Sequence, residues 1–381
     1  MLNKTIVIGA GILGASTAYH LSKLGAGQVI IVDRQDEGQA TDAAAGIICP
    51  WISQRRNQAW YELAKNGAKY YPHLIAELEQ VGQGETGYAS VGALRLHTER
   101  EKIIQIEQRA LTRKESAPEM GSLTVLNPAE TSQLFPILDH GYHSLQVSGA
   151  ARIDGRALRE ALLHAAKQNG ASFIKGDAHL RWDHLTGGSG KKRIIGVKVN
   201  GHSIDASQVI VCAGAWARSI FQPLGIDLRV QFQKAQIVHL HLPNYQTKRW
   251  PVIMPPGNQY LLSFKGGRVV VGTTYEETTD HSDTRATAGG IHEILTKAIE
   301  IAPGLMSSAY LETRVGFRPY TPGFLPIIGS IPGWDGVLLA NGLGASGLTV
   351  GPYLGFELAK LALGLNIDID LKLYDIKGAL G

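Results

Sequence analysis

Three glycines near the start of the chain have the spacing of a dinucleotide-binding turn. Gly9, Gly11 and Gly14 follow a short apolar run and open a stretch with helical character. In such a turn the first glycine permits a tight bend, the second lets the backbone approach a pyrophosphate, and the third lets the helix pack on the strand. Amide groups at the start of the helix then face the phosphates. The pattern therefore predicts a bound dinucleotide.

An acidic residue and a loop of small residues narrow the choice of dinucleotide. Asp33 ends the next apolar run, where a carboxylate can accept hydrogen bonds from ribose hydroxyls and would repel the 2′-phosphate of NADP. The loop 41–48 consists mainly of Ala, Gly and Ile, so its backbone can approach a bulky ribityl chain and isoalloxazine. These features favour FAD over NAD.

The elements that must position these residues begin as β-α-β. Residues 4–8 and 28–32 have the apolar composition of buried strands, and residues 15–24 have the pattern of a helix. Apolar residues then recur at helical spacing between 60 and 78, where Pro72 predicts a break or kink.

The pattern changes at about residue 84 and becomes α+β. A strand is predicted over 91–97, followed by a charged helix that Thr98 and Glu101 would cap. A hairpin turn is predicted around residues 187–192, and strands dominate from 230 to 274.

Composition and charge exclude several classes of protein. At 381 residues, with 44% hydrophobic and 18% charged residues, the chain should fold as two domains. The net charge of +4 is small and the basic residues are scattered, so no nucleic-acid partner is expected. The two cysteines lie far apart and the histidines lack ligand spacing, so neither a disulfide framework nor a metal site is expected. Glycines interrupt the apolar N-terminal run and no stretch approaches the ~20 residues of a membrane span, so a cytoplasmic protein is expected.

Further segments complete a pattern that resembles one family of flavoproteins, the glycine oxidases, D-amino-acid oxidases and sarcosine oxidases. The resemblance extends over nearly the whole chain and rests on the order and spacing of its motifs. These are GAGILG at 9–14 with Asp33, AAAGIICP at 43–50, VIVCAGAW at 209–216, YLL at 260–262, VVVGTT at 269–274, GFRPYTP at 316–322, PIIG at 326–329 and NGLGASG at 341–347.

The resemblance implies an α/β plus α+β fold of the glutathione-reductase-like type. A discontinuous FAD-binding Rossmann domain would comprise residues 1–85, 146–228 and 322–381. A second domain, with a mainly antiparallel sheet, would bind the substrate and comprise residues 86–145 and 229–321.

The resemblance also assigns roles in the substrate pocket. Arg318 would bind the substrate carboxylate with its planar guanidinium, and Tyr260 would line the pocket and hydrogen-bond the same carboxylate. Sarcosine oxidases carry a flavin-linked cysteine at the place of Arg318, so non-covalent FAD is expected. Asp42 stands in place of a serine, Leu343 in place of a histidine, and Ala345 in place of a polar or basic residue. The last two departures should make the pocket wall near the flavin more apolar.

The cofactor-binding residues expected from the turn and the resemblance are spread along the chain. They are Gly9, Gly11, Ile12, Leu13 and Gly14 in the turn, Asp33, Arg34, Thr41, Ala45, Gly46 and Ile47 after the second strand, Ala178, Gly214 and Trp216 in the middle, and Gly344, Ala345, Ser346, Gly347, Leu348 and Thr349 near the end. The backbone of the last group, at a helix start, would stabilise charge at the N1–C2 carbonyl edge of the flavin.

The implied reaction is the FAD-dependent oxidative deamination of a small amino acid, such as a D-amino acid or glycine. Hydride transfer from the α-carbon to flavin N5 would give an imine and then an oxo acid, and orientation of the substrate suffices for this step. The alternatives are a secondary-amine (sarcosine- or proline-type) oxidase or dehydrogenase, a non-catalytic flavin-binding subunit of a larger complex, and an NAD-linked dehydrogenase. The sequence leaves open oxygen or quinone as electron acceptor, peripheral membrane contact and a homo-oligomer.

Overall fold

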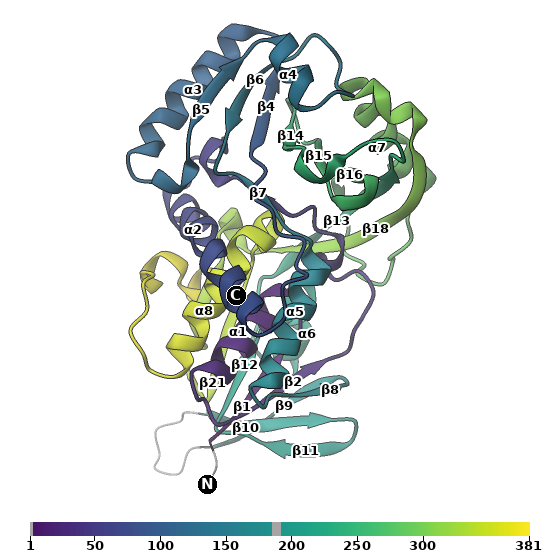
Figure 1. Ribbon diagram of the computed structural model, residues 1–381. Coiled ribbons are helices and arrows are strands. Elements are labelled where there is room, and N and C mark those ends of the chain that lie inside the picture. Colours follow the sequence, from purple (N-terminus) through teal and green to yellow (C-terminus); the bar gives the residue numbers. More distant parts are fainter. Residues whose placement is uncertain (1–2, 185–191) are drawn as a thin grey trace.

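Two large sheets occupy the two halves of the molecule. The computed structural model describes residues 3–184 and 192–381, so most of the hairpin turn predicted around 187–192 lies outside the described residues. In the view of Figure 1, a six-stranded sheet lies in the lower half and a nine-stranded sheet in the upper half.

The six-stranded sheet contains the predicted β-α-β start. Its spatial order is β19 (Ile327–Ser330), β21 (Val337–Asn341), β12 (Gln208–Val211), β1 (Lys4–Ile8), β2 (Gln28–Asp33) and β8 (Ser172–Lys175). All neighbouring strands are parallel except β19, which is antiparallel to β21. Runs of Val and Ile are expected in such strands, because both faces of a parallel sheet are covered.

Helices cover one face of this sheet and a smaller sheet covers the other. The helices are α1 (Ile12–Lys23), α5 (Gly155–Gln168) and α8 (Gly347–Ala362), and α2 (Gln58–Gln80) packs on α8. The short helix α6 (Ala217–Phe221) belongs to the core cluster on the side of the smaller sheet. The smaller, mainly antiparallel sheet contains β9 (Ala178–His184), β10 (Lys192–Val199), β11 (His202–Asp205) and β20 (Trp334–Asp335). Because side chains alternate along a strand, Val7 packs among the helices while Ile6 and Ile8 pack against the smaller sheet.

The nine-stranded sheet is antiparallel except where β14 meets β4. Its order is β17 (Glu276–Glu277), β13 (Gln231–His241), β16 (Arg268–Gly272), β15 (Tyr260–Ser263), β14 (Val252–Met254), β4 (Ala93–His97), β6 (His143–Val147) and β5 (Leu123–Leu126), with β18 (Ala309–Tyr320) paired to β13. Helices α3 (Arg100–Lys114), α4 (Pro128–Leu134) and α7 (Ala288–Ile301) pack on this sheet, and the pair β3 (Ile47–Ile48) and β7 (Ala151–Arg152) lies nearby. The long strand β18 extends from this sheet toward the other half (Figure 1).

The sheets follow the predicted division of the chain with one exception. Every strand of the six-stranded sheet and of the smaller sheet lies within 1–85, 146–228 or 322–381. Strand β6 belongs to the nine-stranded sheet and spans the predicted boundary between residues 145 and 146. The domain boundaries themselves stay a prediction.

Two local predictions differ from the structure. Helix α2 continues without a break through Pro72 from residue 58 to residue 80, because its buried face, which includes Tyr71 and Leu74, keeps it packed across the proline. A kink at Pro72 stays a prediction. Helix α3 is not capped by Thr98 and Glu101. It starts at Arg100 with Glu99 at the N-cap position and no side-chain cap, one residue later than a cap by Thr98 requires. The amide of Glu99 donates to Nδ1 of His97 at 3.0 Å.

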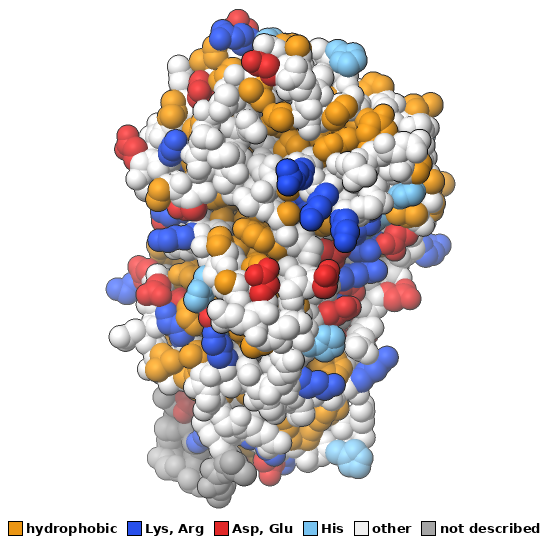
Figure 2. Space-filling model, viewed as in Figure 1, with side chains coloured by type: hydrophobic (Ala, Val, Ile, Leu, Met, Phe, Trp, Pro, Cys, Tyr) orange, Lys and Arg blue, Asp and Glu red, His pale blue; other side chains and the backbone are white. Residues whose placement is uncertain are grey.

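Charged side chains meet where the two large sheets join. Arg268 on β16 pairs with Asp154, the residue before α5, at 2.6 Å. Arg314 on β18 pairs with Glu312 at 2.6 Å and donates to the backbone oxygen of Asp42 at 3.4 Å. Figure 2 shows basic and acidic side chains interspersed across the middle of the molecule on the face in view. The Arg268–Asp154 ion pair and the hydrogen bond from Arg314 to Asp42 connect the nine-stranded sheet to segments of the other half. Within the described residues, no helix has both the length and the apolar character needed to cross a membrane.

A glycine in α2 tests how closely this helix packs on α8. A Cβ at Gly67 would overlap the carbonyl oxygen of Thr349, so Gly67→Ala should lower the free energy of unfolding by about 1–3 kcal/mol despite the higher helix propensity of alanine. Gly289 in α7 is the matched control, because a Cβ there would meet no atom within 4 Å. Gly289→Ala should be neutral or stabilise by less than about 1 kcal/mol. Urea unfolding measures both, and a Gly67→Ala variant as stable as the wild type would contradict the close packing.

Candidate active site

The predicted dinucleotide turn lies between β1 and α1. Gly9 has a φ of +99°, and a Cβ there would lie 2.5 Å from the carbonyl oxygen of Cys212, so only glycine fits. A Cβ at Gly14 would overlap the carbonyl oxygen of Gly9, so the absence of a side chain lets the helix pack on the turn. Gly11 precedes α1 and lines the pocket, so the start of the helix is open toward it.

Asp33 connects this turn to the loop after β2. One carboxylate oxygen accepts a hydrogen bond from the amide of Ala10 at 2.6 Å. The other accepts from the amide of Gln35 at 2.5 Å and from Nε2 of Gln39 at 3.0 Å. The side chain is buried at the end of β2, where the sequence predicts it, and it lines the pocket beside the turn. Its contact with a ribose stays a prediction.

A smaller pocket continues from the main one at Asp33. Its walls include Arg34, Ala178 and Trp216, and the guanidinium carbon of Arg34 lies 6.0 Å from the centroid of the Trp216 ring. Gly9, Asp33 and Trp216 line both pockets. A flat, partly aromatic wall of this kind suits the adenine end of a dinucleotide.

The loop of small residues, 41–48, lies against the glycine turn, and contacts with neighbouring elements hold it there. Oγ1 of Thr41 accepts from the amide of Ile12 at 2.9 Å. Asp42 does not line the pocket. Its carboxylate forms an ion pair with Arg159 of α5 at 2.5 Å. The aspartate that replaces the family's serine therefore anchors this loop on a neighbouring helix. At Gly46, where φ is +93°, the backbone runs against Ile153 too closely for a side chain.

The start of α8 lies beside this loop and lines the pocket. The hydroxyl of Tyr71 donates to the backbone oxygen of Leu348 at 2.5 Å, and Oγ1 of Thr349 donates to the backbone oxygen of Ile47 at 3.0 Å. Ser346 faces away from the pocket and accepts from Nε1 of Trp60 at 2.9 Å. Helix α2 and the small-residue loop thus hold the start of α8 in place.

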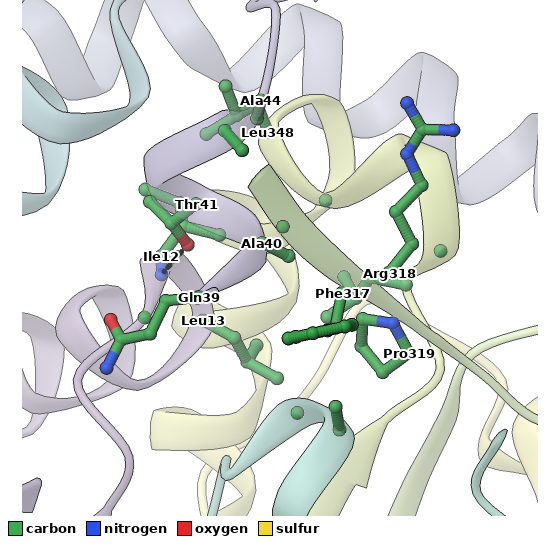
Figure 3. Close-up of a pocket in the computed structure, with 18 of the residues that line it drawn as sticks. Ile12, Leu13, Gln39, Ala40, Thr41, Ala44, Phe317, Arg318, Pro319 and Leu348 are labelled. Atoms are coloured by element: carbon green, nitrogen blue, oxygen red, sulfur yellow. Dashed lines mark hydrogen bonds between the residues drawn. The ribbon is translucent and has the colours of Figure 1, made fainter. Parts of the chain in front are cut away.

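Arg318 enters the pocket from β18. Figure 3 shows it on the opposite side from Ile12, Thr41 and Gln39. Its Nη2 donates to Oγ1 of Thr273 at 3.0 Å, whereas its Nη1 is buried without a hydrogen-bond partner among the described residues. Its guanidinium carbon lies 4.8 Å from the centroid of the Tyr275 ring. Arg318 therefore carries a buried donor that none of the described residues satisfies.

Tyr260 lies on β15 close to Arg318. Its hydroxyl lies 2.8 Å from the position that a Cβ on Gly272 would take. Burial raises the pKa of Tyr260 and the charge of Arg318 opposes this rise. Because the net direction is upward, the hydroxyl is protonated at neutral pH and can donate a hydrogen bond to an anion.

The structure brings nearly all of the predicted site residues to the main pocket. Its wall contains each of them except Arg34 and Ala178, which line the adjoining pocket, and Gly14 and Ser346, which lie behind the wall. Their individual roles stay predictions. Within the part of the chain that the structure describes, no group of three or more His, Cys, Asp or Glu residues could hold a metal ion.

Three residues of the site were missed by the sequence reasoning. Tyr275 and Asn341 line the pocket, and Nδ2 of Asn341 donates to the backbone oxygen of Gly214 at 2.9 Å. Thr273 does not line the pocket, but its hydroxyl accepts a hydrogen bond from Arg318. Two of these positions belong to motifs that carry the resemblance, VVVGTT and NGLGASG, but the motifs alone do not indicate which way a side chain points.

The residues present fit FAD. The glycine turn, the open start of α1 and the continuous pockets provide an elongated cradle that ends at Arg318. Burial raises the pKa of the thiols of Cys49 and Cys212 to about 12. Since the thiolate is the reactive form of cysteine, neither residue is suited to form a covalent flavin bond.

Comparison with known proteins establishes the family. The sequence profile of the DAO family of FAD-dependent oxidoreductases matches residues 4–361, so the chain belongs to this family. It is 55% identical over 375 residues to YurR of Bacillus subtilis (strain 168), an uncharacterized oxidoreductase, with 98% of this chain and 99% of that protein covered. It is 27% identical over 387 residues to a glycine oxidase of Pseudomonas putida, with 100% of both chains covered.

A solved structure supports the same assignment. The fold is similar to that of iminodiacetate oxidase from Chelativorans sp. BNC1, with a TM-score of 0.92, 42% identity, and 97% of this chain and 98% of that chain covered. The predicted family, the fold class with a Rossmann FAD-binding domain and a second domain, the FAD cofactor and the assignment as an oxidoreductase are confirmed. The chain is thus an FAD-dependent enzyme of the amine and amino-acid oxidoreductase group.

The attachment of the cofactor can be tested directly. Because both thiols are buried and Arg318 stands at the place of the flavin-linked cysteine, acid precipitation of the purified protein should release all of the yellow colour as FAD. Absorbance and chromatography of the supernatant measure this. Colour retained in the pellet would contradict non-covalent binding, and release of FMN would contradict the dinucleotide site.

Proposed function

We propose that this protein oxidises the carbon–nitrogen bond of a small secondary amine that carries a carboxylate, such as an N-substituted glycine. The observation that carries the proposal is Arg318, which lines the pocket and whose buried Nη1 has no hydrogen-bond partner among the described residues. Leaving a buried donor unpaired costs roughly 1–3 kcal/mol, and a carboxylate is the ligand that best satisfies a guanidinium.

The charges of the pocket favour an uncharged amine. Asp33 and Arg318 are the charged residues on its wall, and Asp33 belongs to the dinucleotide end. No carboxylate among these wall residues is therefore close to Arg318 to hold an ammonium group. A buried ammonium without a partner is costly, so the amine should bind deprotonated, with its lone pair free to assist loss of hydride from the adjacent carbon.

The residues beside Arg318 would orient this substrate. Arg318 would hold the carboxylate, and the protonated hydroxyl of Tyr260 would donate to it. The apolar side chains of Leu343 and Leu348 would exclude water from the reacting carbon. FAD, when bound, supplies the hydride acceptor. Since orientation is the main requirement of hydride transfer, no further acid or base is needed from the chain.

A secondary amine is preferred to a primary amine for two reasons. The 42% identical structural relative is an iminodiacetate oxidase, and iminodiacetate is a secondary amine with two carboxylates. The pocket wall near the flavin site is apolar at Leu343 and Ala345, where a group attached to the nitrogen can find contact. Hydrolysis of the imine product would give a primary amine and an oxo acid.

Oxidative deamination of glycine or a D-amino acid is the second candidate, because glycine oxidases are similar over the whole chain. Oxygen and quinone both stay predictions for the electron acceptor.

A substrate panel tests this proposal. Anaerobic rapid mixing with N-methylglycine, N-ethylglycine, iminodiacetate, glycine and D-alanine should reduce the flavin faster with the N-substituted glycines. The expected gain over glycine is about fourfold for each carbon added on the nitrogen, because each buried methylene contributes about 0.8 kcal/mol. The bleaching of the flavin absorbance gives the rates. If glycine or D-alanine is fastest, the second candidate is correct. If no amine of the panel bleaches the flavin, the alternative of a non-catalytic flavin-binding subunit gains support.

A further inference from the structure

Two residues of one short segment contact the guanidinium of Arg318 from different sides. Oγ1 of Thr273 accepts a hydrogen bond from Nη2 at 3.0 Å, in the plane of the group. The guanidinium carbon lies over the ring of Tyr275, 4.8 Å from its centroid. Nη1 is buried and has no hydrogen-bond partner among the described residues, and the Arg318 side chain lines the pocket. A hydrogen bond and a ring contact together restrict the orientation of a guanidinium more than either does alone.

The direction of the Thr273 hydrogen bonds is determined by chemistry. An arginine side chain only donates, so the Thr273 hydroxyl must accept from Nη2. Its single proton is then directed away from Arg318, and the backbone oxygen of Gln236 accepts it at 2.9 Å. Thr273 is buried, so water does not compete for either bond. The hydroxyl therefore connects Arg318 to the backbone of β13.

Gln236 also anchors the segment that carries Tyr275. Its Nε2 donates to the carboxylate of Glu276 at 2.7 Å, and its Oε1 accepts from the amide of Thr287 at 2.9 Å. The side chain is fully buried and so is expected to be held in one conformation. Both ends of the segment 276–287 are thus tied to one strand, which keeps the neighbouring Tyr275 beside Arg318.

Tyr275 is exposed to an unusual degree for an aromatic residue of a pocket wall. Its relative exposure is 49%, although its ring is in contact with the guanidinium of Arg318. Stacking on the cation is the contact that the structure offers.

We propose that Thr273 and Tyr275 form a clamp that sets the plane of Arg318, so that Nη1 and the open edge of the guanidinium meet the substrate carboxylate. The clamp rests on the proposed function, since it needs a carboxylate ligand. Thr273 and Tyr275 are positioning residues, because they act through Arg318 and not on the reacting carbon. Their loss should weaken carboxylate binding more than it slows the reduction of the flavin.

The test compares disruptive and conservative variants of the holoenzyme. Thr273→Val removes the hydroxyl at nearly constant shape, and Thr273→Ser restores it. Tyr275→Ala removes the ring, and Tyr275→Phe retains it. The exposed tyrosine Tyr310 of β18, at 53% exposure, provides the control variant Tyr310→Ala. Spectral titration of the bound flavin with methoxyacetate, a carboxylate that has no amine to oxidise, measures binding without turnover.

Thr273→Val and Tyr275→Ala should each raise the Kd of methoxyacetate and the KM of N-methylglycine about tenfold, as expected for the loss of an interaction with a charged group. The limiting rate of flavin reduction should change less than about threefold, since an orienting contact made equally in the ground and transition states affects KM more than kcat. Thr273→Ser, Tyr275→Phe and Tyr310→Ala should bind methoxyacetate as the wild type does. Equal thermal unfolding temperatures would show that the variants are folded.

The failure of the clamp and the failure of the proposed function give different results. Wild-type affinity for methoxyacetate in both Thr273→Val and Tyr275→Ala would overturn the clamp alone, provided that the wild type binds methoxyacetate and is reduced by N-methylglycine. A wild-type protein that does neither would overturn the proposed function and the clamp together.

Discussion

A guanidinium whose buried Nη1 has no hydrogen-bond partner among the described residues is the constraint on which this site depends. Leaving a buried donor unpaired costs roughly 1–3 kcal/mol, and the cost is relieved when an anion binds. Arg318 is held in this state by a long strand, β18, that carries it from the nine-stranded sheet to the edge of the cofactor cradle. The Arg268–Asp154 ion pair and the hydrogen bond from Arg314 to the backbone of Asp42 stabilise the same junction. The fold therefore places a carboxylate receptor at the flavin end of a dinucleotide site.

The cofactor cradle depends on close backbone contacts, which explains why small residues surround it. Gly9, Gly14 and Gly46 each stand where a side chain would collide with a carbonyl group. The loop at Thr41 is then secured by polar contacts, with Asp42 paired to Arg159 on the side away from the pocket. Asp42 thus stabilises the loop through Arg159, at a position where the family carries serine. The same arrangement leaves the pocket wall largely apolar between Asp33 and Arg318.

Much of the fold was predictable, because strand and helix periods and the glycine spacing are local signals. The β-α-β start and the acid at the end of β2 both lie where the residues indicate them. Helix α2 has no break at Pro72, because tertiary packing outweighs local preference, and α3 begins one residue later than a cap by Thr98 requires. Arg318 and Tyr260 were found only through resemblance. Thr273, Tyr275 and Gln236 were not found, since their contacts join strands that are distant in sequence and no spacing rule encodes them.

The most direct test of the central claim pairs a change in Arg318 with a change in the substrate. Anaerobic reduction efficiencies would be measured for N-methylglycine and for N-ethylmethylamine, which replaces the carboxylate by a methyl group, in wild type, Arg318→Lys and Arg318→Ala with equal FAD content. A charge-assisted bidentate contact predicts that the wild type prefers N-methylglycine by about 100-fold or more, that Arg318→Lys keeps part of this preference, and that Arg318→Ala loses nearly all of it. An undiminished preference in Arg318→Ala would contradict the account, because the carboxylate would then be bound elsewhere.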